Sequence, residues 1–180
     1  MLWKESFMRK TSQSGFTLIE LIVVIVILGV LAGIALPKFG NMQAQARIAK
    51  MQGAMGAMKS ASALSHALLV ANNYASSYSG NPAASTTTGT VDINVEGIDV
   101  VYEVGYPTAG TIAPLAGIGN TVVTTAGSIG DYYLVSVTGG VLTLAPDANH
   151  TSCAITYTQA TTSSVTPVFS DAGLTVGNCE

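Results

Sequence analysis

Gly15-Phe16-Thr17-Leu18-Ile19-Glu20 opens the stretch that decides the organisation of this chain, and the uncharged, mostly apolar residues 21–36 complete it. As a helix, residues 16–36 would be about 31 Å long, which is enough to cross the hydrocarbon core of a membrane. A carboxylate inside such a segment costs about 2.5–3.5 kcal/mol on insertion scales. We therefore expect Glu20 to have a role that offsets this cost.

Three kinds of N-terminal apolar segment fit this pattern. A permanent membrane anchor accounts for the length but leaves Glu20 unexplained. An ordinary secretory signal could be cut near the small residues 33–35, but that cut would remove Glu20. A cut between Gly15 and Phe16 would keep the apolar segment in the mature chain and free an amine on Phe16. Basic residues precede the segment and predict a cytoplasmic N-terminal end: Lys4, Arg9 and Lys10.

The motif quoted above, together with the apolar run Leu21–Leu28, resembles the class III signal of type IV pilins and of the related type II secretion pseudopilins. The resemblance implies that a prepilin peptidase cuts after Gly15 and methylates the new amine of Phe16. The leader of residues 1–15 is long for this class, and Met8 is an alternative start.

The resemblance assigns Glu20 to filament assembly. In a helix, Phe16 and Glu20 lie one turn apart on one face. An incoming subunit that is shifted along the filament axis could place its Glu20 against the positive Phe16 amine of its neighbour, because opposite charges attract strongly where water is absent. The alternative is that Glu20 makes contacts only within its own helix.

Two further features predict that this helix packs closely against other helices and can lose part of its helical structure. Gly29 and Gly33 form a GxxxG pattern, which allows the backbones of two helices to approach each other. Pro37 removes one helical hydrogen bond. The resemblance implies that the segment from Gly29 to Pro37 can lose helicity inside a filament.

Residues 37–74 carry the pattern of an amphipathic helix, with apolar residues mostly three or four positions apart. The expected apolar face comprises Met42, Ala46, Ile48, Met51, Met55, Met58, Leu64 and Leu68. Other faces are expected to carry Lys50, Lys59 and Ser62. We interpret the methionines as core residues that pack against a sheet. The residues 75–90, rich in Ser, Thr, Gly and Ala, predict a variable surface loop.

Residues 91–180 predict a head domain built on one antiparallel sheet that packs on the C-terminal half of the long helix. The expected strands are 91–95, 98–104, 132–137, 141–145 and 154–159, with weaker patterns at 121–125 and 165–169. Residues 106–120 otherwise predict a loop. The predicted class is therefore α+β, with a transmembrane and filament-core helix over residues 16–36, as in the pilin fold that the resemblance implies.

The only two cysteines, Cys153 and Cys179, lie near the C-terminus. In an exported domain this even number predicts one disulfide, which would bound a C-terminal loop and stabilise the fold by roughly 3–4 kcal/mol. The alternative is a pair of unrelated buried thiols. Their spacing is too wide for a CxxC redox or zinc motif.

Charge is divided unevenly along the chain. All seven basic residues lie at or before Lys59, and residues 60–180 contain only acidic charges. Binding of nucleic acid by the head domain is therefore disfavoured, because phosphate contacts need cations. Stacked acidic heads would repel one another, so some of the remaining cations are expected to meet acidic head residues of neighbouring subunits: Lys38, Arg47, Lys50 and Lys59.

No catalytic constellation stands out in the sequence. His66 and His150 lack a second ligand at metal spacing, and the oxygens near Asp147 and Asn149 do not complete a calcium loop. Asn149-His150-Thr151 matches a glycosylation sequon, which is short enough to arise by chance. We expect no enzymatic activity, no metal and no cofactor.

The resemblance implies a major structural subunit of a type IV pilus, which polymerises through its N-terminal helix into an extracellular filament for attachment and biofilm formation. The subunit would wait in the inner membrane as a single-pass protein with a cytoplasmic N-terminus. Its partners would be copies of itself, the prepilin peptidase, an inner-membrane assembly platform and minor pilins. The alternatives are a type II secretion pseudopilin, which is a periplasmic piston subunit, and a membrane-anchored binding domain that does not assemble.

Short matches narrow the resemblance to one subgroup. Residues 36–39, 46–48 and 153–157, and the small and methionine residues 53–58, resemble the major pilin of the mannose-sensitive haemagglutinin (MSHA) pilus. A role in surface attachment follows from that resemblance.

Overall fold

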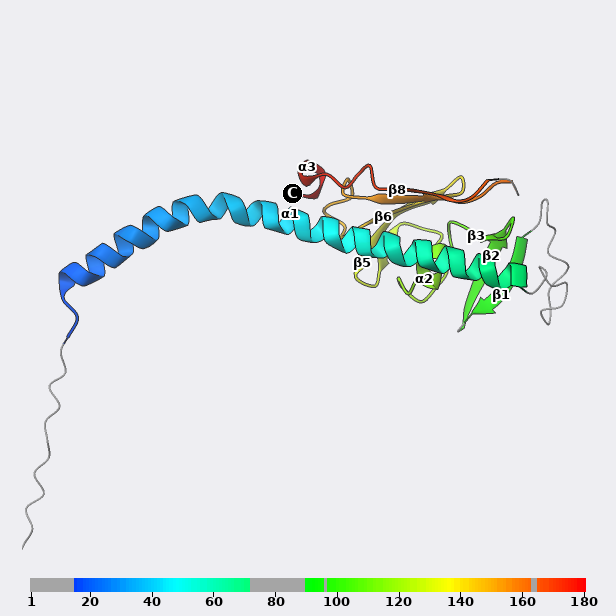
Figure 1. The fold of residues 1–180 in the computed structure, drawn as a ribbon, viewed down its shortest axis with the longest axis horizontal. Coiled ribbons are helices and arrows are strands. Elements are labelled where there is room, and N and C mark those ends of the chain that lie inside the picture. Colours follow the sequence, from blue (N-terminus) through cyan, green and yellow to red (C-terminus); the bar gives the residue numbers. More distant parts are fainter. Residues whose placement is uncertain (1–14, 72–89, 96, 163–164) are drawn as a thin grey trace, which may run out of the picture. The chain divides into compact units, whose positions relative to one another are not determined.

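The computed structural model describes residues 15–71, 90–95, 97–162 and 165–180 (Figure 1). Its residues form two compact units, with the boundary after Phe39. The long helix α1 spans Leu18–Ala71 and belongs to both units. The α+β class with a long N-terminal helix and antiparallel sheets is confirmed. The expected leader and the expected loop at 75–90 lie outside the described residues, apart from Gly15 and Thr90.

The first unit holds the apolar part of α1. Its side chains from Leu18 to Leu36 are almost all exposed, and by length and composition this helix could cross a membrane. A helix satisfies its own backbone hydrogen bonds, so an apolar sequence of this length is suited to a bilayer. The helix begins at Leu18, two residues after the expected start at Phe16.

In the second unit, one stripe of α1 packs into the main core of the head. The buried residues of α1 recur three or four positions apart through most of this part: Ala44, Met51, Ala54, Met55, Met58, Ser62, Ser65 and Leu69. This spacing is that of one face of an α-helix. The prediction that methionines pack in the core is confirmed for Met51, Met55 and Met58.

The predicted apolar face was wrong at both ends. Met42, Leu64 and Leu68 are 60%, 65% and 55% exposed, whereas Ser62, which was expected on another face, is only 4% exposed. The stripe that starts at Met51 continues in phase through Ser62 and Ser65, and Leu64 falls outside it. The Ser65 hydroxyl donates to the Ser62 carbonyl at 3.0 Å, so burial leaves it paired.

The head contains two antiparallel sheets where one was expected. The three-stranded sheet has the order β1-β2-β3, with bounds Thr90–Val95, Ile98–Glu103 and Tyr106–Pro107. The five-stranded sheet has the order β4-β5-β6-β7-β8, with bounds Gly127–Ile129, Tyr132–Thr138, Val141–Ala145, Ile155–Thr158 and Val168–Ser170. Two short helices complete the described elements: α2 (Ile112–Leu115) and α3 (Val176–Cys179).

Local patterns predicted the hairpins better than the connections between them. The β5–β6 hairpin turns at Gly139 and Gly140, whose φ angles of 58° and 76° favour glycine. The expected strand at 121–125 is wrong, and strand β4 follows it instead. Val123 is buried, and its N–H donates to the Gly110 carbonyl at 3.0 Å, so its apolar character reflects loop burial.

The region expected to be a loop, residues 106–120, contains β3 and α2. The last strand, β8, begins three residues later than the expected start at Val165. Pro167 precedes it, and a proline cannot donate to a sheet ladder.

A buried tyrosine connects the two sheets. Tyr157 of β7 is fully buried in the main core, and its hydroxyl donates to the carbonyl of Pro107 in β3. The side chain of Gln159 accepts the Ala109 N–H at 2.9 Å and donates to the carboxylate of Glu103 in β2. These contacts hold the short sheet against the larger one.

Candidate functional site

The predicted cleavage site lies immediately before α1. Gly15, Phe16 and Thr17 are not helical, and Phe16 is 93% exposed. Thr17 occupies the position that precedes the first helical residue, Leu18, which is the N-cap position. The bond between Gly15 and Phe16 therefore lies in accessible, irregular chain.

Thr17 and Glu20 form a reciprocal capping box. The Glu20 carboxylate accepts the Thr17 N–H at 2.9 Å and the Thr17 hydroxyl at 2.8 Å. The Glu20 N–H donates to the Thr17 hydroxyl oxygen at 3.3 Å. Two amides at the helix start thereby gain acceptors, and such caps are typically worth about 1 kcal/mol.

Glu20 therefore has a partner in its own chain. Phe16 lies before the helix, so the one-turn relationship expected between Phe16 and Glu20 does not form in the single subunit. The Thr-x-x-Glu spacing before an apolar run is a sequence pattern typical of a capping box, and it could have indicated this contact. The role of Glu20 between subunits stays a prediction.

The glycine pair and the proline lie inside a continuous helix. Gly29 and Gly33 have nothing within 4 Å of the position that a Cβ would occupy, so this part of α1 has an open surface. Pro37 has no N–H, and the carbonyl of Gly33 thus lacks its usual helical donor. Loss of helicity between Gly29 and Pro37 in a filament stays a prediction.

The predicted disulfide is confirmed. Cys153, in the turn before β7, is bonded to Cys179 of α3, and both are fully buried in the main core. Their Cα atoms are 4.8 Å apart, within the usual range for a disulfide.

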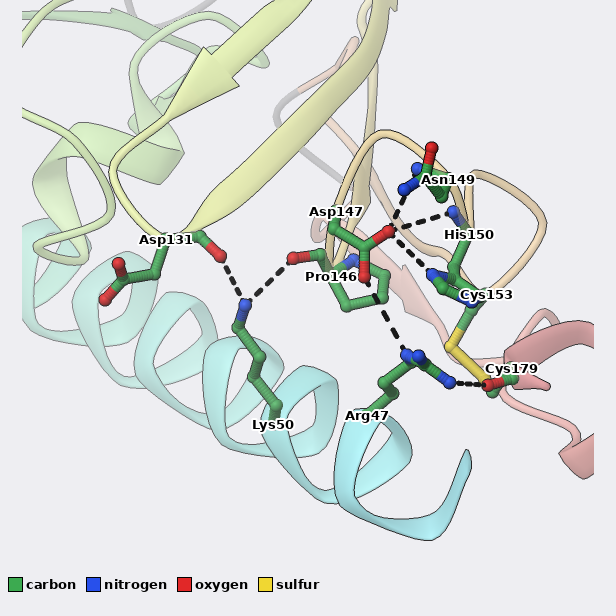
Figure 2. Close-up of polar contacts among 9 residues, drawn as sticks. All are labelled: Arg47, Lys50, Asp131, Pro146, Asp147, Asn149, His150, Cys153 and Cys179. Atoms are coloured by element: carbon green, nitrogen blue, oxygen red, sulfur yellow. Dashed lines mark hydrogen bonds and ion pairs between the residues drawn. A yellow bond between two sulfur atoms is a disulfide. The ribbon is translucent and has the colours of Figure 1, made fainter. Parts of the chain in front are cut away.

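A polar cluster surrounds this disulfide (Figure 2). The Arg47 guanidinium of α1 donates from Nη1 to the Cys179 carbonyl at 2.8 Å, and its Nε lies 3.8 Å from Oδ2 of Asp147. The other carboxylate oxygen of Asp147 accepts the N–H groups of Asn149 and His150 and lies 2.6 Å from Nδ1 of His150.

The contacts of Asp147 lower the pKa of its carboxyl group. Burial acts to raise this pKa, but the hydrogen bonds from His150 and Asn149 and the positive charges of His150 and Arg47 together outweigh that effect. Asp147 is therefore held in its charged form.

Lys50 anchors α1 on the head one turn after Arg47. Its Nζ donates to the carbonyls of Asp131 and Pro146, the latter at 2.8 Å, and lies 4.6 Å from the ring centroid of Tyr132 (Figure 2). Arg47 and Lys50 are two of the four cations of which some were expected to meet neighbouring subunits, and both are engaged within their own head. The sequence carried a partial sign of these contacts, because residues 60–180 contain acidic residues but no Lys or Arg of their own.

Both histidines contact neighbouring groups. Nδ1 of His66 is 2.9 Å from the Gly105 carbonyl, and its ring stacks on Tyr106 with centroids 4.1 Å apart. Within the described part of the chain, no group of three or more His, Cys, Asp or Glu residues is placed to hold a metal ion.

Comparison with known proteins gives one family match and several partial relatives. Residues 10–36 match the family described as the prokaryotic N-terminal methylation motif. The type IV major fimbrial protein FimA of Dichelobacter nodosus is 42% identical over 52 residues, which is 29% of this chain and 33% of FimA. The type II secretion system core protein G of Pseudomonas aeruginosa is 43% identical over 54 residues, 30% of this chain and 38% of that protein.

Another relative matches over more residues. The type IV narrow pilus major component PilA5 of Thermus thermophilus is 37% identical over 75 residues, which is 42% of this chain and 65% of PilA5. The first relatives are matched over about a third of their own length. No solved structure matches the chain. The motif at residues 10–36 and the similarity to fimbrial relatives support the type IV pilin family.

Proposed function

We propose that this chain is a major structural subunit of a type IV pilus and polymerises through its N-terminal helix into an extracellular filament. The observation that carries the proposal is the methylation motif over residues 10–36, joined to an exposed apolar helix with Glu20 in its first turn. FimA and PilA5, which are named as a major fimbrial protein and a major pilus component, are similar to part of this chain.

The assembly step has a physical basis in the helix start. In the single subunit, the Glu20 charge is satisfied by Thr17. Cleavage after Gly15 by a prepilin peptidase would create a positive amine on Phe16, and methylation would leave that charge in place. A neighbouring Glu20 can then exchange its Thr17 contacts for an ion pair with this amine, which is strong where water is excluded.

The surroundings of the subunit follow from the same proposal. Before assembly, the apolar part of α1 would span the inner membrane once, with its N-terminus in the cytoplasm; an assembly platform and minor pilins would then draw the subunit into the filament. The polymer itself is structural, without catalytic activity. Surface attachment, as in the MSHA subgroup, is the proposed use of the filament.

A type II secretion pseudopilin is the second candidate, because core protein G of a type II secretion system is 43% identical over 54 residues. The C-terminal disulfide and the long segment between α1 and β1 favour the pilin. Electron microscopy of filaments sheared from producing cells distinguishes the two, since a pseudopilin at native expression gives no long surface filaments.

The experiment that tests the assembly role compares Glu20→Ala with Glu20→Gln. Glutamine can still accept the Thr17 N–H, so Glu20→Gln keeps the cap and loses only the charge. We expect both variants to be cleaved after Gly15, methylated on Phe16 and inserted in the membrane, and neither to form filaments. Mass spectrometry of the N-terminal peptide reports the processing.

Normal filaments from Glu20→Gln would contradict the ion-pair mechanism and leave Glu20 with a capping role alone. Unprocessed chains in both variants would place Glu20 in recognition by the peptidase. Wild-type cells without filaments, but with a secretion defect on deletion of the gene, would favour the pseudopilin.

A further inference from the structure

We infer that Arg47 is a positioning residue for formation of the Cys153–Cys179 disulfide, so that the bond closes rapidly only once α1 has docked on the head. The inference is independent of the proposed function, because it concerns the folding of one subunit. It rests on the contacts that Arg47 makes to the two segments that carry the cysteines, which we call the arms of the C-terminal loop (Figure 2).

The first arm carries Cys179. Arg47 Nη1 donates to the Cys179 carbonyl at 2.8 Å, although the two residues are 132 positions apart. The arm has local order of its own, because the Thr175 side chain accepts the Asn178 N–H and the Cys179 N–H donates to the Thr175 carbonyl at 3.1 Å. Arg47 therefore fixes a preformed turn against α1.

The second arm carries Cys153. Its N–H donates to the His150 carbonyl at 3.0 Å, and the His150 N–H donates to Asp147 Oδ1 at 3.1 Å. Asp147 Oδ2 faces Arg47 Nε at 3.8 Å. The turn from Asp147 to Cys153 is thereby tied to the same guanidinium as Cys179, and one side chain of α1 brings both cysteines together.

The chemistry needs this proximity at one step. A protein disulfide of the extracytoplasmic compartment, or glutathione disulfide in a test, first accepts attack by one cysteine thiolate, and one thiolate leaves the oxidant. The second cysteine, as a thiolate, then attacks the mixed disulfide; the intramolecular S–S bond forms and the second thiolate of the oxidant leaves. Two electrons pass to the oxidant, and the two cysteine protons go to solvent or to the departing thiolates.

Arg47 accelerates the second, intramolecular attack. The cysteines are separated by 26 positions, so an undocked loop samples many arrangements before the sulfurs meet. Because Arg47 contacts both arms, the docked loop has far fewer arrangements to sample before the two sulfurs meet. Hydrogen bonds to a charged donor are the stronger kind, so loss of Arg47 should reduce the fraction of closed arrangements roughly tenfold.

Lys50 provides a matched control. It lies on α1 three positions after Arg47 and also docks the helix on the head, through the carbonyls of Asp131 and Pro146. None of its described contacts is to a cysteine or to the Asp147 carboxylate. Lys50→Ala therefore weakens docking and frees the Pro146 carbonyl, next to the second arm, but it keeps the contacts of Arg47 with both arms.

The test follows oxidation of the full-length chain in cells that lack their disulfide-forming catalyst, with glutathione disulfide added as the oxidant. Free thiols are trapped with a maleimide at successive times after a radioactive pulse. We expect Arg47→Ala to lengthen the half-time of closure roughly tenfold, and Lys50→Ala to change it less than about twofold.

Thermal unfolding of the oxidised variants separates positioning from general stabilisation. Comparable melting midpoints for Arg47→Ala and Lys50→Ala, with different closure rates, support the inference. Equal slowing of closure in both variants would mean that helix docking alone matters, and this would overturn the inference. An unchanged closure rate in Arg47→Ala would overturn it as well.

Asp147→Asn is the second variant if Arg47→Ala does not fold. It keeps the Arg47–Cys179 contact and should slow closure about threefold. No slowing in Asp147→Asn would overturn the inference.

Discussion

The Glu20 carboxylate accepts two hydrogen bonds from Thr17, one from the main-chain N–H at 2.9 Å and one from the hydroxyl at 2.8 Å. The costly carboxylate of the apolar segment is therefore satisfied within the single subunit. If Glu20 changes partners during assembly, its new interaction in the filament must be stronger than the two hydrogen bonds to Thr17 that it gives up.

Thr17→Val should loosen the start of α1. The substitution keeps the side-chain volume but removes the hydroxyl that accepts the Glu20 N–H, and loss of such a cap costs about 1 kcal/mol. We expect hydrogen exchange of the Glu20 amide to accelerate about fivefold in the full chain in detergent micelles. Thr17→Ser retains the hydroxyl and should exchange like the wild type; equally fast exchange in both variants would argue against the capping box.

Tyr157→Phe should weaken the connection between the two sheets. The variant leaves the Pro107 carbonyl without its donor in the core, and an unpaired buried polar group costs about 1–3 kcal/mol. Burial raises the pKa of Tyr157, so its hydroxyl keeps its proton, and the bond, through the neutral pH range. Urea unfolding of the disulfide-bonded chain measures the loss.

Tyr133→Phe is the control for that substitution. Tyr133 is only partly buried, and it lies on β5 of the same five-stranded sheet. Its variant should unfold within about 0.5 kcal/mol of the wild type. An equally small effect of Tyr157→Phe would show that its bond to Pro107 contributes nothing to stability.

Asp147 should make stability dependent on acid pH. Its pKa is lower in the folded chain than the ordinary value of 3.8, so the unfolded chain binds a proton more readily. The stabilisation is fully present above pH 3.8 and is lost as the pH falls through the lower folded-state pKa. The difference in melting midpoint between wild type and Asp147→Asn should therefore shrink as the pH falls below about 4. A difference that grows below about pH 4 would contradict this assignment.

Gly173→Ala should destabilise the C-terminal loop. A Cβ at Gly173 would clash with the Ala154 carbonyl oxygen, and main chain cannot move away as a flexible side chain can. We expect a loss of about 1–3 kcal/mol in urea unfolding. Gly177→Ala is the matched control, because nothing lies within 4 Å of its Cβ position, and it should leave stability unchanged or slightly higher. Equal behaviour of the two variants would refute the close approach at Gly173.

Local patterns in the sequence predicted the elements whose causes are local. The apolar run after Gly15 predicted the helix, the glycine pair at 139–140 predicted the β5–β6 hairpin, and the even number of cysteines predicted the disulfide. Each of these depends on residues that are close in sequence or on chemistry that needs no register between elements. The Thr17–Glu20 cap belongs to the same group, since its three-residue spacing is visible in the sequence.

The tertiary structure decided what depends on contacts between distant segments. Helical periodicity does not state which face of α1 meets the head. Ser62 and Ser65 are buried and the larger Leu64 is exposed, because the two serines lie on the same helix face as Met51 and Leu64 does not. The split into two sheets likewise depends on the strand pairings that form in space.

By itself, the sequence determined an apolar N-terminal helix with a carboxylate in its first turn, a β-rich acidic domain and a pair of cysteines. Only the tertiary structure placed Arg47 between Asp147 and the Cys179 carbonyl and Lys50 between the carbonyls of Asp131 and Pro146. The physical reason is that a main-chain carbonyl carries no sequence identity: a cation can be read from the sequence, but the carbonyl that it binds is known only once the chain has folded.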